Sequence, residues 1–109
     1  MKGILLVMSD ATPGEDDAYN TWYDDVHLAD VLNVPGIVAA RRFAAVPSVH
    51  GELPPAPYLA IYEIDADDLD EVQRALSVAA KGMDISAALD RSTAVTYTYR
   101  LLTETAPDA

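Results

Sequence analysis

Residues 19–43 read YNTWYDDVHLADVLNVPGIVAARRF, and they predict a helix, a turn and a strand in succession. Three aromatic side chains recur at the spacing of one helix face: Tyr19, Trp22 and Tyr23. The valine-proline-glycine sequence at 34–36 ends the helix, because the residue before a proline is disfavoured from helical backbone. The apolar run over residues 37–46 then predicts a strand.

On either side of this stretch, apolar runs bounded by turn residues predict three more strands, and apolar residues at helical spacing predict a second helix. The expected elements are a strand at 3–9, a helix capped by Thr12 and ending near Leu32, strands at 37–46 and 58–65, a helix capped by Asp67 or Asp68 and ending at Lys81-Gly82, and a strand at 93–103. This order is the ferredoxin-like α+β pattern, with two helices on one face of a four-stranded antiparallel sheet. We expect one domain over 1–103 and a frayed tail over 104–109.

The composition excludes several classes of partner. The net charge of −11 over 109 residues disfavours nucleic acid and anionic membranes, which both require a basic surface. The chain contains no cysteine, so disulfides, thiolate nucleophiles and cysteine-ligated metals are excluded. No apolar run reaches the length of a membrane span or of a signal-peptide core. We therefore expect a soluble cytoplasmic protein.

Two strands are apolar on both faces, at residues 4–8 and 58–62. An antiparallel sheet with one wet face would alternate apolar and polar side chains instead. The pattern therefore predicts that a second copy covers the face without helices, as a twofold homodimer. The alternative is that the proline-rich loop 47–57, or the tail, folds over this face.

The helix also carries groups that can perform chemistry. Spacing of about 100° per residue places Asp30 on the aromatic face, with His27 at its edge and Asp24 pointing elsewhere. In a catalytic interpretation, His27 is a general acid or base, and Asp30 orients it and favours its imidazolium form. Tyr23 and Tyr19 would then offer hydroxyls to a substrate oxygen, and Trp22 would form an apolar wall. The alternative is a rim histidine, with Asp30 in a structural ion pair.

Adjacent arginines in a strand point to opposite faces. Small neighbours favour Arg42 for the helix side, where it could bind a substrate oxygen or pair with Asp30. Arg41 would then lie on the other face, where it could pair with Glu63. We expect Tyr62 and Tyr97 to shape the pocket and His50, in the proline-rich loop, to act from a lid. No metal is expected, because two histidine and aspartate ligands do not make a site.

Four short motifs resemble the dimeric α/β-barrel superfamily, and within it the EthD-like group. They are Trp22-Tyr23, His27-Leu28-x-Asp30, Val34-Pro35-Gly36 and Ala40-Arg41-Arg42-Phe43. The resemblance implies a ferredoxin-like fold, a homodimer whose sheets form a barrel, and a pocket between sheet and helices in each subunit. A helix histidine at the position of His27 is an acid or base in some members of the group.

Proteins of this group include cofactor-free monooxygenases, cyclases, lactone isomerases, decarboxylases, haem-degrading enzymes and members without assigned activity. The chain lacks the cysteine of muconolactone-type isomerases and the constellation of the haem-degrading members, so we expect no cofactor. Our leading hypothesis is a cofactor-independent isomerase, cyclase, lyase or eliminating enzyme acting on a small aromatic or cyclic oxygenated substrate. The alternatives are a cofactor-less monooxygenase of an electron-rich phenol and a non-catalytic ligand-binding or accessory dimer.

Overall fold

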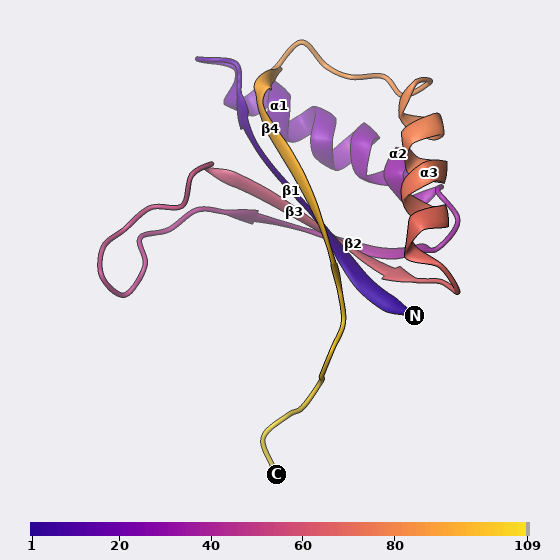
Figure 1. Ribbon diagram of the computed structural model, residues 1–109. Coiled ribbons are helices and arrows are strands. Elements are labelled where there is room, and N and C mark those ends of the chain that lie inside the picture. Colours follow the sequence, from indigo (N-terminus) through magenta and orange to yellow (C-terminus); the bar gives the residue numbers. More distant parts are fainter. Residues whose placement is uncertain (109) are drawn as a thin grey trace.

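A four-stranded antiparallel sheet organises the protein in the computed structural model, which describes residues 1–108 (Figure 1). The strands are β1 (Lys2–Ala11), β2 (Ile37–Ala44), β3 (Tyr58–Asp65) and β4 (Leu89–Arg100). They lie in the order β2-β3-β1-β4, and every neighbouring pair is antiparallel. The predicted ferredoxin-like α+β fold is thus confirmed. Ala109, the last residue of the expected tail, lies outside the described residues.

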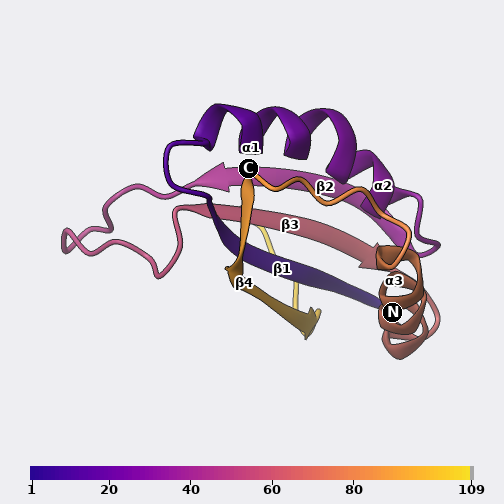
Figure 2. The same ribbon diagram turned by 90° about the horizontal axis from the view of Figure 1, so that it is seen from above.

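The helices lie on one side of this sheet (Figure 2). The first is a continuous run of α1 (Asp16–Trp22), a π-helical turn η1 (Tyr23–His27) and α2 (Leu28–Leu32); the second is α3 (Leu69–Ala80). Asp68 caps α3 as predicted, since its carboxylate accepts a hydrogen bond from the Asp70 N–H at 2.9 Å. Among residues 1–108, no helix has the length and apolar character needed to cross a bilayer.

The first helix begins later than predicted. Thr12 does not cap it, because its hydroxyl donates to the Ala87 carbonyl at 2.8 Å. Its own carbonyl instead accepts from the Glu15 N–H at 2.9 Å, which closes a turn before α1. Thr12 therefore joins the start of the helix to the segment that leads into β4.

The π-helical turn changes which residues the helix buries. A π turn holds more residues than an α turn, so side chains after it are displaced around the axis. Val31 is consequently buried, whereas Asp30 is only half-buried. The prediction that Asp30 lies on the buried face was wrong for this reason.

The sheet presents two different faces. On the helix side, directly opposed residues include Leu5, Tyr62 and Ala40, and the first two are fully buried. The other side, here called the outer face, is apolar and carries no helix. Its members are Ile4, Leu6, Met8, Phe43, Leu59, Ile61, Val95, Tyr97 and Tyr99, with the exposed ion pair Arg41–Glu63 beside them. Among residues 1–108, the loop between β2 and β3 extends away from this face, and the tail after β4 meets it only at one end, where residues 101–104 line a hollow with it (Figure 1).

Gly36 joins the first helix to β2 at a position that only glycine fits. Its φ of 94° lies in the left-handed region, and a Cβ there would meet the Cγ2 of Val72 at 2.7 Å. The valine-proline-glycine break thus does two things: it ends the helix, and it lets α3 pack close to the turn.

Candidate functional site

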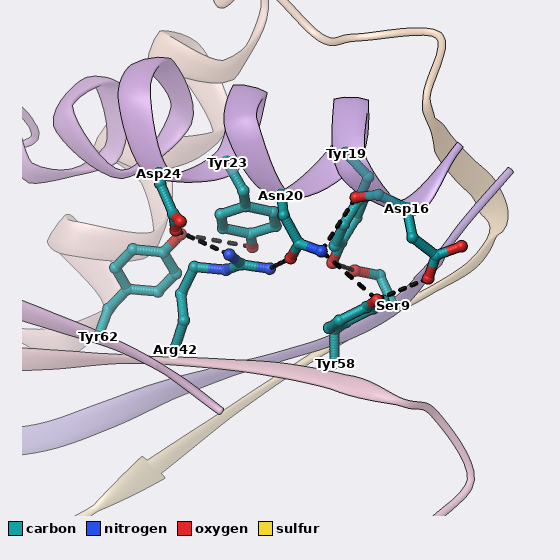
Figure 3. Close-up of polar contacts among 9 residues, drawn as sticks. All are labelled: Ser9, Asp16, Tyr19, Asn20, Tyr23, Asp24, Arg42, Tyr58 and Tyr62. Carbon is teal, nitrogen blue, oxygen red and sulfur yellow. Dashed lines mark hydrogen bonds and ion pairs between the residues drawn. The ribbon is translucent and has the colours of Figure 1, made fainter. Parts of the chain in front are cut away.

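Arg42 lies at the centre of a polar cluster between the first helix and the sheet (Figure 3). Its side chain is 14% exposed, and one terminal nitrogen donates to Asp24 Oδ1 at 2.7 Å. The other donates to Asn20 Oδ1 at 2.8 Å. Its opposed neighbour on β3 is Ala60, whose small side chain leaves room for the guanidinium. The predicted orientations are confirmed: Arg42 faces the helices, and Arg41 pairs with Glu63 at 3.7 Å on the outer face.

Three tyrosine rings surround the Arg42 guanidinium. Its Cζ lies 4.5 Å from the ring centroid of Tyr23, 5.5 Å from that of Tyr19 and 5.8 Å from that of Tyr58. Contacts of this kind stabilise a cation because the ring face carries negative charge. The guanidinium therefore remains charged in a largely aromatic setting, which suits the binding of an anionic oxygen.

The tyrosine hydroxyls extend the network in two directions. Tyr19 shares a hydrogen bond of 2.7 Å with Ser9, and both side chains are fully buried. Tyr58 donates to Asp16 Oδ2 at 2.6 Å and accepts a longer bond of 3.4 Å from the Asn20 amide. Tyr62 and Tyr23 meet through their hydroxyls at 3.5 Å, the outer limit of a hydrogen bond.

His27 lies beside the aromatic residues but away from the charged network. Its ring stacks on Trp22 at 4.6 Å between centroids and meets the edge of Tyr23 at 5.0 Å. Trp22 is itself fixed by a hydrogen bond of 2.8 Å from its Nε1 to the Asp84 carbonyl. The Nδ1 of His27 is buried and has no hydrogen-bond partner among the described residues. A nitrogen of this kind can accept a proton or bind a ligand.

The protonation states follow from burial. Burial lowers the pKa of His27, and the nearby charge of Asp30 opposes that shift without cancelling it. Burial raises the pKa of Tyr23 to about 12 and also raises the pKa of Tyr62 and of Tyr19. His27 is therefore a neutral imidazole at neutral pH, and the phenols are hydrogen-bond donors. Asp30 does favour the imidazolium form, as predicted, but desolvation is the larger effect and the pKa of His27 is lowered.

Several predicted site residues fall elsewhere. Tyr97 lies on the outer face and is half-exposed, because it opposes Leu6, whereas Thr98 faces the helices and bonds Gln73 of α3. His50 is exposed on a loop that extends beyond the end of the sheet, so it does not cover the cluster in its own chain (Figure 2). Asp30 makes no hydrogen bond within the described residues and neither orients His27 nor pairs with an arginine.

Sequence reasoning missed Asn20 and Asp24, which hold Arg42, and Asp16, which holds Tyr58. An ideal helix projection pointed Asp24 away from the aromatic face, yet Asp24 lies within the π turn and reaches the guanidinium. Asn20 precedes the π turn and lies one residue after Tyr19. A search for polar partners within one turn of each buried aromatic would have found it.

The two most prominent surface hollows of residues 1–108 are not lined by His27 or Arg42. One of about 690 Å³ lies at an end of the outer face, and one of about 430 Å³ lies between Gly36 and the start of α3. Within residues 1–108, no three histidine, aspartate or glutamate side chains converge as metal ligands. The His27 ring itself packs against the aromatic rings of Trp22 and Tyr23.

No protein-family model matches the chain, and no curated protein matches it at the sequence level. Solved structures do resemble it. An EthD family protein from Bacillus halodurans superimposes with a TM-score of 0.64 at 15% identity, covering 94% of this chain and 100% of its own. A putative monooxygenase from Shewanella loihica gives 0.59 at 11% identity, covering 94% and 96%. The heme-degrader MhuD from Mycobacterium tuberculosis, with two hemes bound, gives 0.58 at 15% identity, covering 95% and 99%.

These similarities confirm the predicted resemblance at the level of the fold. The chain has the ferredoxin-like architecture of EthD family proteins and of related α/β-barrel proteins over nearly its whole length. Identities of this size carry no activity from one protein to another. The function has to be argued from the cluster itself.

Proposed function

We propose that the protein is a cofactor-independent enzyme that transfers protons on a small aromatic or cyclic substrate bearing a carbonyl or phenol oxygen. The observation that carries this proposal is the buried, unpartnered Nδ1 of His27 beside Trp22 and Tyr23. A neutral imidazole in an apolar setting is a competent base near neutral pH. Isomerisation, cyclisation, elimination and lyase cleavage all begin with such a proton transfer.

Arg42 and Tyr23 would stabilise the oxygen that becomes negative when the proton leaves. A guanidinium has five N–H donors, and the hydrogen bonds to Asp24 and Asn20 use two of them. Tyr23 lies between the two functional groups, with His27 at its ring edge and Arg42 over its ring face. This arrangement favours one substrate whose acidic carbon faces His27 and whose oxygen faces Arg42.

The remaining aromatic residues would shape the pocket. Trp22 offers a flat surface parallel to the His27 ring, at an interplanar angle of 24°. Tyr19 and Tyr62 are fully buried and close the inner wall. Their contribution is to exclude water and to orient an apolar ring, and neither acts as a base because burial raises the pKa of each phenol.

Proton transfer can be measured before the natural substrate is known. In D₂O, a base that removes an acidic C–H proton exchanges it for deuterium, which ¹H NMR detects as loss of the C–H signal. We expect the wild type to exchange the acidic proton of one or more members of a panel of aryl ketones, cyclic enones and lactones. His27→Gln is expected to lower that rate by about 10²- to 10⁴-fold.

His50→Gln is the matched control, because His50 is the only other histidine and lies on the projecting loop. It should exchange at the wild-type rate. Equal rates for His27→Gln and the wild type would contradict the proposal. So would a wild type that exchanges no member of the panel above the buffer rate.

A non-catalytic binding dimer is the second candidate, and one observation favours it. Neither hollow reaches His27, and the two terminal nitrogens of Arg42 are already hydrogen-bonded. In that case an aromatic probe would bind without exchange, and His27→Gln would leave its affinity unchanged. A cofactor-less monooxygenase would use the same proton removal, followed by reaction of the carbanion with oxygen. Oxygen consumption with an electron-rich phenol separates it from the leading proposal.

We further propose that the protein is a homodimer formed through the outer face. That face exposes large apolar side chains such as Phe43, Val95 and Tyr99, and within residues 1–108 only the start of the tail lies against one end of it. A second copy is the simplest cover, because a twofold interface places the same surface on both sides. Analytical ultracentrifugation tests this directly, and a sedimenting species of one chain at all concentrations would contradict it. We expect the dimer to act in the cytoplasm, as its composition predicts.

A further inference from the structure

The loop between β2 and β3, residues 45–57, is a hydrogen-bonded arm whose residues 46–55 are all exposed. The Ala45 N–H donates to the Pro57 carbonyl at 2.8 Å, which continues the ladder of the two strands. Near the tip, the Ser48 N–H donates to the Glu52 carbonyl at 2.8 Å. The arm projects beyond the end of the sheet, away from the rest of the molecule (Figures 1 and 2). Its shape is therefore set by its own hydrogen bonds.

The arm carries apolar side chains that a free loop would not be expected to expose together. Val46 is 72% exposed, Val49 93% and Leu53 69%. Loops are normally polar, and clustered apolar side chains on a projecting segment indicate a surface that is buried in contact with a partner. The arm thus has the composition of a docking element.

The larger hollow provides a matching surface. It occupies about 690 Å³ and is lined by residues of all four strands and of the tail. Its apolar members include Ile4, Val38, Tyr99 and Leu102, and of these Val38 and Leu102 are strongly exposed. The lining also includes charged residues, namely Lys2, Glu63, Asp65, Arg100 and Glu104. The apolar part of the hollow suits aliphatic side chains of the size of valine and leucine.

The arm and the hollow lie at opposite ends of the same sheet. The arm follows Ala44 and precedes Tyr58, which pairs with Ser9, whereas the hollow lies near Lys2, which pairs with Asp65. Two copies can pack outer face to outer face about a twofold axis that lies between the sheets and runs perpendicular to the strands. The strands of one copy then run opposite to those of the other. The arm end of each copy therefore lies over the hollow end of its partner.

We propose that the arm of each copy docks in the hollow of its partner, with Val49 and Leu53 as the inserted side chains. The inference rests on the proposed outer-face dimer and deepens it. A face of four strands, which are eight to twelve residues long, has a flat area of about 600 Å². A standard interface buries about 800 Å² per partner, so the two arms would supply much of the remainder. His50 then becomes part of the contact between subunits.

Cross-linking tests the arrangement cleanly, because the chain contains no cysteine. Val49→Cys is introduced in one chain and Val38→Cys in a second chain of different size, and the mixed dimer is oxidised. We expect a disulfide between the two chains. Val78→Cys on α3 is the control partner, since Val78 is comparably exposed but lies far from the outer face, and it should not cross-link with Val49→Cys.

Sedimentation provides the second measurement. We expect the double substitution Val49→Ser and Leu53→Ser to raise the dimer Kd by at least about 100-fold, since two arms each lose apolar burial. Val78→Ser should leave the Kd unchanged. Far-UV circular dichroism should show the wild-type fold, because both substituted side chains are exposed in the single chain.

Three results would overturn the arm-in-hollow arrangement. The first is a dimer that gives only a 49–49 disulfide, which places arm against arm. The second is a dimer with no 49–38 disulfide above the Val78→Cys control and a Kd unaffected by the serine substitutions. Either result would contradict the arm proposal and leave the outer-face dimer unaffected. The third is a wild-type monomer, which would remove both and leave the proposed chemistry of His27 untouched.

Discussion

Replacing Arg42 with methionine removes the guanidinium while keeping an unbranched apolar side chain in its place. The variant loses a hydrogen bond to Asn20 from a charged donor, worth about 1.5–3 kcal/mol. It also loses the ion pair with Asp24, worth about 0.5–1 kcal/mol because the Asp24 side chain is 58% exposed. The contact with the Tyr23 ring adds about 0.5–1 kcal/mol.

Part of this loss is recovered, because the methionine no longer requires a charge to be held away from water. We therefore expect Arg42→Met to lower the free energy of unfolding by about 1–3 kcal/mol. Arg74→Met is the matched control. Its side chain is 68% exposed, and its nearest carboxylate oxygen, on Asp68, lies 4.0 Å away, so the expected loss is below about 0.5 kcal/mol.

Urea titration measures both variants. Trp22 is the only tryptophan and is buried, so its fluorescence reports unfolding of the helix that covers the cluster. The chain concentration is held fixed, because dimer formation would make stability depend on it. Losses for Arg42→Met and Arg74→Met that agree within about 0.5 kcal/mol would refute the description of Arg42 as the centre of the cluster.

Three further predictions follow from the same contacts. Because burial lowers the pKa of His27, the unfolded state binds more protons below about pH 6.5. The free energy of unfolding should therefore decrease as the pH is lowered below that value, by up to about 1.4 kcal/mol per pH unit, and His27→Gln should flatten that dependence. Gly36→Ala should lower the free energy of unfolding, measured by thermal unfolding, by at least about 2 kcal/mol more than Gly14→Ala. Both glycines have a positive φ, but a Cβ at Gly14 would meet only open space. Ser9→Ala should lower the free energy of unfolding by about 1–3 kcal/mol, because it leaves the buried Tyr19 hydroxyl unpaired. Adding Tyr19→Phe to that variant should restore part of the loss. Strictly additive losses in the double variant would contradict the Ser9–Tyr19 hydrogen bond.

The fold could be predicted because several local signals agreed. Apolar runs, the proline-glycine break and the capped second helix specified the order of the elements and placed most of their ends within a few residues. Tyr19, Trp22 and Tyr23 were placed correctly on the buried face because they precede or begin the π turn. An apolar stripe and a strand-terminating turn are properties of short segments, so one sequence suffices to show them.

The site was harder to predict because it depends on departures from ideal geometry. No residue type marks a π turn, so the ideal helix projection misplaced Asp24 and Asp30, which lie within or beyond it. On β4, tyrosines and threonines alternate, and the sequence does not say which set faces the helices. Register with β1 decides this, and it places Tyr97 on the outer face.

The protonation of His27 could not be predicted for a related reason. The sequence shows Asp30 three residues away, which suggests a charge that would favour the imidazolium form. Burial beside Trp22 has the larger effect, and Trp22 is held in place by the carbonyl of Asp84, which is far away in sequence.

The most direct test of the proposed chemistry uses a His50→Gln protein, in which His27 is the only histidine. Its imidazole is titrated by NMR while the deuterium-exchange rate of the best aromatic probe is measured over the same pH range. We predict one midpoint for both, below pH 6.5, with exchange increasing as the imidazole loses its proton. An exchange rate that does not follow the titration, or a midpoint at or above 6.5, would contradict the assignment of His27 as the base.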